Sequence, residues 1–188
     1  MTKSDTNMEQ KERIKKEAIR LFEAQGYYGT TVRQISQAAK CSLPMMYYYY
    51  QSKETLFAEI VYTDFMAVLA QLNKAISPDT PPVEYYTRMI GWLSDLPDRD
   101  RAIYKLAIKV YLGFEGDIPI RREIIKWEDS ILIRHETMLK AHYPDREDLP
   151  IVTRLLIRTL EHMIEEIIVL GNIIPEEQVR DQITHILG

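Results

Sequence analysis

Four consecutive tyrosines, Tyr47 to Tyr50, are separated by one residue, Gln51, from a Ser-Lys-Glu in this chain of 188 residues. A phenol combines a ring that packs with a hydroxyl that hydrogen-bonds, and such hydroxyls often contact the phosphate oxygens of DNA. At 100° per residue the four rings point in four directions around a helix. Met46 and Tyr50 then share one side, and Pro44 and Tyr48 share roughly the opposite side. We interpret the run as a buried anchor, an outward reader and two flanking hydroxyl donors.

Helix start signals surround the tyrosines. Thr31 and Gln34 form a capping box for a helix over 31–39, and Ser42 caps a helix over 42–50. Two short helices joined by a tight turn have the geometry of a helix-turn-helix, whose second helix enters the major groove of DNA. A helical hairpin is also common as plain packing. The distribution of the tyrosines favours the DNA-binding interpretation.

Proline and glycine divide the rest of the chain into further helical segments, and no β pattern or repeat appears. The sequence therefore predicts an all-α fold of about nine helices. A three-helix, helix-turn-helix DNA-binding domain would occupy 1–55, and a larger helical bundle would occupy 56–188. The predicted helices are 7–25, 31–39, 42–50, 52–76, 82–95, 98–114, 119–142, 150–170 and 175–187.

The composition is that of a globular protein, with 46% apolar and 28% charged residues. One cysteine, Cys41, excludes an intramolecular disulfide and a thiolate zinc cluster, so a reducing, cytoplasmic setting is expected. The polar start "MTKSDTNMEQ" has no secretory signal pattern, and no uninterrupted apolar run approaches the roughly 20 residues that span a bilayer. We expect no association with a membrane.

Charge is unevenly distributed along the chain. The formal net charge is −4, but residues 1–58 hold nine Lys and Arg against six Asp and Glu, whereas the remainder holds fifteen against twenty-two. A basic end and an acidic body indicate separate tasks, because basic surfaces favour nucleic acids.

Motifs for enzymatic chemistry are missing from the sequence. No Glu precedes a His by three residues, as four-helix carboxylate metal sites require, and no P-loop, dinucleotide fingerprint or serine elbow appears. We therefore expect no enzyme activity and no cofactor or metal. The alternative to a DNA binder is a helical protein-interaction module whose helix-turn-helix no longer binds DNA, with Leu43, Pro44 and Met45 in an apolar patch beside the tyrosines.

The stretch 18–57 resembles the DNA-binding domain of the TetR family of transcriptional regulators. Two departures stand out: Lys40 replaces the usual turn glycine, at some conformational cost, and Tyr50 replaces a phenylalanine, so that its hydroxyl must reach solvent or a partner. The residues that match the family's pattern are Leu21, Phe22, Gly26, Tyr27, Thr30, Thr31, Ile35, Ala38, Ala39, Ser42, Tyr47, Tyr49, Ser52, Lys53, Glu54 and Leu56.

The resemblance implies a homodimeric repressor that binds double-stranded DNA and is released by a small-molecule inducer. Its operator would be near-palindromic, with half-sites about 34–36 Å apart or somewhat wider. Thr31, Tyr47, Tyr49 and Lys53 would contact phosphates, and Arg33 a base. The complete predicted DNA-binding set is Thr31, Arg33, Ser42, Leu43, Pro44, Met45, Tyr47, Tyr48, Tyr49 and Lys53.

Base recognition is expected to depend on apolar contacts. Leu43, Pro44 and Met45 cannot form bidentate hydrogen bonds with guanine or adenine, and apolar side chains in the major groove complement thymine methyls. The sequence thus predicts a half-site centre that favours A·T pairs.

The body is expected to dimerise through the last two helices, 150–170 and 175–187, as the resemblance implies. Residues 150–170 are apolar beyond one face, which fits a helix covered on several sides. Large side chains on the middle helices, and one histidine further on, suggest a ligand pocket, although simple core packing explains each of them as well. The predicted pocket residues are Trp92, Tyr104, Tyr111, Phe114, Trp127, His135, Met138 and His162.

Overall fold

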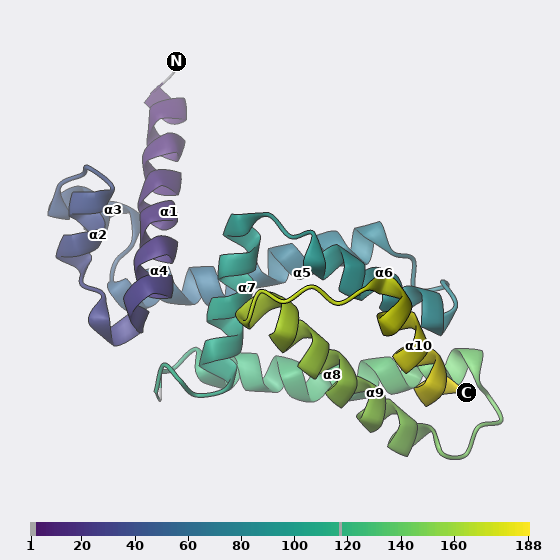
Figure 1. Cartoon of the computed structure of the whole chain (residues 1–188). Coiled ribbons are helices and arrows are strands. Elements are labelled where there is room, and N and C mark those ends of the chain that lie inside the picture. The colour runs from purple at the N-terminus through teal and green to yellow at the C-terminus, as the bar shows by residue number, and fades with distance from the viewer. Residues whose placement is uncertain (1–2, 117) are drawn as a thin grey trace. The chain divides into compact units, whose positions relative to one another are not determined.

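The computed structural model describes residues 3–116 and 118–188, and in these ranges it contains helices and no strands. The all-α prediction is confirmed. When each π-helical segment (η) is counted with the helices it continues, the described residues form nine helices (Figure 1). The elements are α1 (Lys3–Gly29), α2 (Val32–Ala38), α3 (Leu43–Tyr49), α4 (Lys53–Ala58), η1 (Glu59–Asp64), α5 (Phe65–Ala75), α6 (Pro82–Ser94), α7 (Asp98–Tyr111), α8 (Arg121–His142), α9 (Leu149–Ile164), η2 (Glu165–Val169) and α10 (Glu176–Leu187).

The first helix departs from its predicted end. Gly26 was expected to stop it, and its φ of 74° and ψ of 174° do interrupt the helix. One further helical turn then follows, up to Gly29, so α1 is a helix with a break near its end. Glycine adopts this positive φ without the steric cost that a side chain would add.

The chain separates into two compact units. The first unit contains Met1–Ala67 and Asp98–Ile124, and the second contains Val68–Pro97 and Ile125–Gly188. The first unit therefore includes α7, which packs on α1 and η1, in addition to the three amino-terminal helices. The division at 55/56 remains a prediction about domains, and these units describe how the chain packs.

Aromatic and aliphatic side chains form the core of the first unit. Phe22 and Phe57 meet edge to face with ring centroids 4.7 Å apart, and Phe65 and Tyr104 meet similarly at 5.0 Å. Such pairs stabilise a core beyond the area they bury. On α1 the side chains of Ile14, Ala18 and Phe22 are fully buried, whereas Leu21 is half-buried.

One buried cation also belongs to this core. Lys15 on α1 lies 2.7 Å from Glu59 and 3.0 Å from Asp64, at the two ends of η1. Burial acts to lower the pKa of the Lys15 ammonium, but the hydrogen bonds to both carboxylates outweigh it, so the net pKa is raised. The ion pairs hold the π-helical segment against α1.

The core of the second unit lies among α6, α9, η2 and α10. Tyr86 on α6 is fully buried, and its hydroxyl bonds to Nδ1 of His135 on α8 at 2.9 Å. Burial is the main cause that lowers the pKa of His135 to about 4. A neutral imidazole that shares a hydrogen bond with a phenol is thus part of this packing.

One helical stretch among the described residues, Lys53–Ala75, is long and apolar enough to cross a membrane by length and composition alone. Its residues Leu56, Phe57, Ile60 and Val61 are buried in the first unit. Core helices of globular proteins meet the same criterion, so this finding gives only weak support for a membrane span.

Candidate nucleic-acid interface

Three hydroxyl caps define where the short helices of the first unit begin. Thr31 Oγ1 accepts from the Gln34 amide at 3.2 Å, and the Gln34 side chain accepts from the Thr31 amide at 2.8 Å. Ser42 caps α3 through the Met45 amide at 3.3 Å. Ser52 caps α4 in the same way. These bonds satisfy amides that have no partner inside the helix, and they confirm the predicted starts.

The turn between α2 and α3 contains the expected departure from glycine. Lys40 has a φ of 49°, so a residue with a side chain occupies the left-handed region, as predicted. Cys41 is half-buried, and burial raises the pKa of its thiol. A raised pKa keeps the thiol protonated and unreactive at neutral pH.

The two sides of α3 differ as its sequence predicts. Met46 is fully buried, and Tyr50, which follows the helix, is 1% exposed. On the other side Tyr48 is 73% exposed and Tyr47 is 50% exposed, and Pro44 and Met45 are exposed beside them. In Figure 1, α2 and α3 lie beside α1. The helix is therefore anchored by one side and presents an aromatic and apolar surface on the other.

Tyr49 and the hydroxyl of Tyr50 differ from the predicted pattern, whereas the ring of Tyr50 is buried as predicted. Tyr49 is half-buried, and its hydroxyl donates to the side chain of Asn7 on α1. The Tyr50 hydroxyl was expected to reach solvent or a partner. That expectation is wrong, because the oxygen is buried and has no hydrogen-bond partner among the described residues. Burial is the main cause that raises the pKa of this phenol, and the carboxylates of Glu59, Glu12 and Asp64 add to it.

Most of the predicted DNA-binding residues lie on the surface of α2 and α3. Leu43 is half-buried. Arg33 is exposed, whereas the hydroxyl of exposed Thr31 is already engaged with Gln34. The exposed members of the set are Thr31, Arg33, Ser42, Pro44, Met45, Tyr47 and Tyr48.

Lys53 is directed toward the protein. Its ammonium donates to the carbonyl of Tyr27 at 2.8 Å and to that of Thr30 at 2.9 Å. It also lies 4.1 Å from the centroid of the Tyr27 ring. Partial burial lowers the pKa of this ammonium. Two of its three donors hold the turn between α1 and α2, a structural task that sequence reasoning did not foresee.

The predicted pocket residues do not gather in one unit. Tyr104, Tyr111 and Phe114 belong to the first unit, and the other five belong to the second. Phe114 is 76% exposed and His162 is exposed, so neither is enclosed by its own unit. Among these eight residues, half-buried His135 has a neutral ring that is hydrogen-bonded to the Tyr86 hydroxyl.

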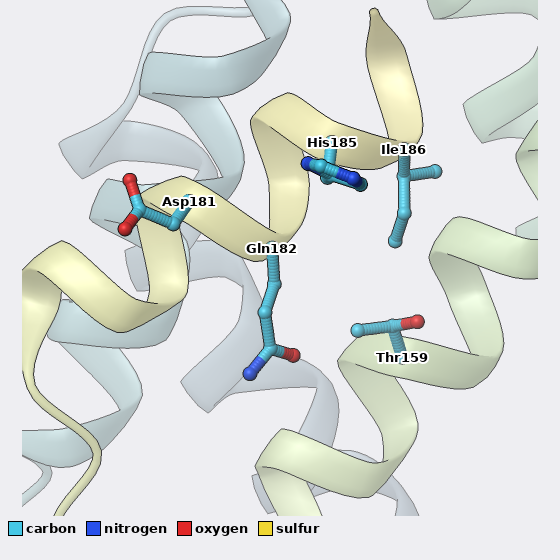
Figure 2. A pocket seen from close by; sticks show the side chains of 5 residues that line it. All are labelled: Thr159, Asp181, Gln182, His185 and Ile186. Carbon is cyan, nitrogen blue, oxygen red and sulfur yellow. The ribbon is translucent and has the colours of Figure 1, made fainter.

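A hollow of about 350 Å³ lies on the surface of the second unit instead. It is lined by Thr159 on α9 and by Asp181, Gln182, His185 and Ile186 on α10. Figure 2 shows Thr159 on one helix and Gln182 and Ile186 on the other, on either side of the hollow. None of the predicted pocket residues lines it. It lies on the two helices that were expected to form the dimer surface.

These features define a class. A helix-turn-helix with a capped, surface-presented second helix, followed in the chain by further helices, is the architecture of helix-turn-helix regulators.

Comparisons with known proteins agree with this class. Residues 14–60 match the family described as "Bacterial regulatory proteins, tetR family". The chain is 37% identical over 66 residues to the HTH-type transcriptional repressor NicS of Pseudomonas putida, a match that covers 34% of this chain and 31% of NicS. It is 28% identical over 118 residues to the regulator HbdR of Aromatoleum sp., covering 63% of this chain and 50% of HbdR. The alignments thus span half or less of these curated relatives.

A solved structure extends the similarity to nearly the whole fold. The multidrug binding protein EbrR, complexed with malachite green, superposes with a TM-score of 0.70 over 95% of this chain and 98% of that chain, at 19% identity. At this identity the likeness concerns the fold alone. Residues 14–60 thus match the amino-terminal part of the TetR family, the partly covered curated relatives NicS and HbdR are transcriptional regulators, and the solved structure shares the fold.

Proposed function

We propose that this protein is a sequence-specific DNA-binding regulator, and that it acts as a homodimeric repressor released from its operator by a small molecule. The observation that carries the proposal is the geometry of α3. Its buried side anchors it through Met46, and its opposite side presents Tyr47, Tyr48, Pro44 and Met45. A helix that enters the major groove needs this division between an anchored and a free side.

Phosphate contacts would position the helix, and base contacts would specify the site. Tyr47 has an exposed hydroxyl on a flank of α3, and Arg33 projects from α2. Hydroxyls and guanidinium groups of this kind bond to phosphate oxygens and guanine edges. Tyr49 and Lys53 would have to exchange or share their present hydrogen bonds to take part.

Base preference would come from apolar contacts. Pro44 and Met45 are exposed, and Leu43 is half-buried at the start of α3. None of the three offers a donor or acceptor in its side chain, so the favourable partner in the major groove is the thymine methyl group. We infer a half-site centre rich in A·T pairs, with Arg33 as the contributor of any guanine contact.

The dimer would form through α9 and α10. Leu156 and Met163 on α9 are buried within the unit, whereas Ile151 is 71% exposed and Leu155 is also exposed. Ile151 and Leu155 are one turn apart, so they form a continuous apolar surface. An apolar surface of this kind on a helix that is already packed on its other side supports an interface with a second copy.

The ligand would bind in the second unit. Buried Tyr86 and half-buried His135 form a hydrogen-bonded polar pair there, and Thr153 Oγ1 on α9 is buried with no hydrogen-bond partner among the described residues. Buried polar groups in an apolar bundle are the groups that orient a small ligand. EbrR, whose fold is similar, was solved with the dye malachite green. We propose a cytoplasmic setting, where both DNA and metabolites are present.

Titration of the protein against the DNA upstream of its own gene tests the proposal. We expect retention in a gel shift with two protein copies per fragment, and an affinity that falls steeply as salt rises, because phosphate contacts release counterions. Selection from random DNA should return a half-site with A·T pairs at its centre. A centre dominated by G·C pairs would contradict the apolar recognition of bases.

A matched pair of variants locates the binding surface. Tyr48→Ala on α3 should weaken operator binding about tenfold or more, since it removes a large exposed ring from the proposed interface. Ile133→Ala removes an equally exposed apolar side chain from α8 and should leave the affinity unchanged. If the wild type retains no DNA at any salt concentration, the helix-turn-helix serves protein interaction instead.

A further inference from the structure

A carboxylate far away in the sequence holds the segment from Gly26 to Thr31, which contains the last turn of α1 and leads to α2; this segment is called the α1–α2 turn. Gly26 interrupts α1, and the amide of the next residue, Tyr27, donates to Oε2 of Glu115 at 2.7 Å. Glu115 lies in the loop between α7 and α8, and only 6% of its surface is exposed. Hydrogen bonds with an ionised partner are stronger than neutral ones, so this bond is a substantial restraint on the turn.

Two glycines allow the loop and the turn to approach closely. A Cβ atom on Gly26 would lie 3.2 Å from Oε2 of Glu115, and a Cβ atom on Gly116 would lie 3.2 Å from the ring of Tyr28. Both glycines have positive φ, 74° and 72°. A side chain at either position would strain the backbone and push the loop away from the turn.

Lys53 holds the carbonyls of the same turn. Its ammonium bonds to the carbonyls of Tyr27 and Thr30, and Thr30 Oγ1 bonds to the carbonyl of Gly26 at 2.8 Å. The Tyr27 ring packs on Phe57 with centroids 4.9 Å apart. The turn is therefore restrained at its amide by Glu115 and at its carbonyls by Lys53.

The turn decides where the helix-turn-helix begins. It ends at Thr31, the cap of α2, and α2 packs against both α1 and α3. A change in the Tyr27–Thr31 backbone therefore alters the position of α2 relative to α1. The surface presented by α3 moves with it.

We propose that Glu115 is a positioning residue for DNA binding and the point at which the α7–α8 loop controls the helix-turn-helix. This inference rests on the proposed function. The loop leads directly into α8, whose residues from Ile125 onward belong to the second unit. Displacement of the loop withdraws the acceptor from Tyr27, loosens the turn and lowers operator affinity without removing any group that touches DNA.

The experiment compares Glu115→Ala with Glu115→Gln in the full-length protein. Both variants remove the same charge, but glutamine keeps an oxygen that can accept from the Tyr27 amide. We expect Glu115→Ala to accelerate hydrogen exchange at the Tyr27 amide at least tenfold and to weaken operator binding about tenfold. The slope of affinity against salt should stay the same, because the phosphate contacts themselves are intact.

Glu115→Gln should restore most of the exchange protection and most of the affinity. Lys105→Ala serves as a control, because it removes an ion pair with Glu23 (3.7 Å) between α7 and α1 without touching the turn. It should leave both readouts unchanged. If Glu115→Ala does not fold, Gly116→Ala displaces the loop while keeping the carboxylate, and it should raise both the exchange rate and the dissociation constant.

Two results would overturn the inference. One is faster exchange at Tyr27 in Glu115→Ala with unchanged operator affinity, and the other is a Glu115→Gln variant as weak as Glu115→Ala. If the wild type binds no DNA, the proposed function fails on its own. Hydrogen exchange at the Tyr27 amide then still tests whether Glu115 restrains the turn. A faster exchange rate in Glu115→Ala than in the wild type supports the restraint, and equal rates overturn it.

Discussion

The helices of the two units begin in different ways. In the first unit α2, α3 and α4 each follow a Thr or Ser whose hydroxyl accepts from an amide of the first turn. In the second unit α6 and α10 follow Pro81 and Pro175, and α9 follows Asp148, with no side-chain hydrogen bond at any of the three caps. Among these six helices, α2, α3 and α4 have hydrogen-bonded side-chain caps, and α6, α9 and α10 do not.

Helix length explains the difference. The capped helices α2 and α3 have seven residues each, whereas α6, α9 and α10 have 13, 16 and 12; α4 has the same kind of cap but continues through η1 into α5. Short helices have few internal hydrogen bonds to offset the cost of nucleation, so satisfied terminal amides matter more for them. Longer helices gain most of their stability from the apolar face that they bury. The comparison indicates that the stability of the helix-turn-helix depends on local hydrogen bonds and that of the second unit on packing.

The largest expected effect tests whether buried apolar side chains stabilise the second unit. Leu156 on α9 is fully buried, so Leu156→Ala should lower the free energy of unfolding by about 2–5 kcal/mol through lost burial and a residual cavity. Urea unfolding followed by circular dichroism measures the change. Ile133→Ala on α8, where the side chain is exposed, should change stability by less than about 0.5 kcal/mol. Equal losses of unfolding free energy in the two variants would contradict the conclusion that packing stabilises the second unit.

The second effect is the pH dependence of stability that His135 of the second unit causes. The pKa of His135 is lowered to about 4 in the folded protein, mainly by burial, whereas an unfolded histidine titrates near 6.5. Between these pH values the unfolded chain binds the proton and the folded chain does not, so stability falls as pH drops from 6.5 to 4. The difference amounts to about 3 kcal/mol at most.

His135→Gln should remove this part of the pH dependence, since glutamine does not titrate but can still bond to the Tyr86 hydroxyl. Urea unfolding at pH 7, 6, 5 and 4 measures the slope. His162→Gln, at an exposed position of the same unit, is the matched control and should retain the wild-type slope. A wild-type slope in His135→Gln would show that the ring is already charged in the fold.

The smallest effect tests the caps. Ser42→Ala removes the acceptor of the Met45 amide at the start of α3 and should cost about 1 kcal/mol of stability. Ser42→Asn keeps a capping oxygen and should lose less. Thermal unfolding measures both variants. An alanine variant as stable as the wild type would show that α3 is held by packing alone, as the helices of the body are.

Much of the helix-turn-helix could be predicted because its determinants are close together in the sequence. The Thr31–Gln34 box and the Ser42 cap join residues three positions apart, and the sides of α3 follow from 100° per residue. The positive φ of Lys40 was expected from the resemblance, because Lys40 replaces the family's usual turn glycine. The helices of the body could be predicted, but its ligand pocket could not. Large apolar residues line both protein cores and ligand pockets, so their presence does not distinguish the two.

Other features could not be predicted. The resemblance implied a phosphate contact for Lys53, which stays a prediction, but nothing in the sequence showed that its ammonium bonds to the carbonyls of Tyr27 and Thr30. The Tyr50 hydroxyl was expected to reach solvent or a partner, and it is enclosed. No local signal marks Glu115 as the acceptor for an amide 88 positions away.

The sequence alone determined the helical class, the caps and the two sides of α3, since these depend on bonds and rotations over three or four residues. Only the tertiary structure decided which buried groups meet. Glu115 reaches Tyr27, and His135 reaches Tyr86, because the paths of distant helices bring them together, and the spacing of residues along the chain does not encode those paths.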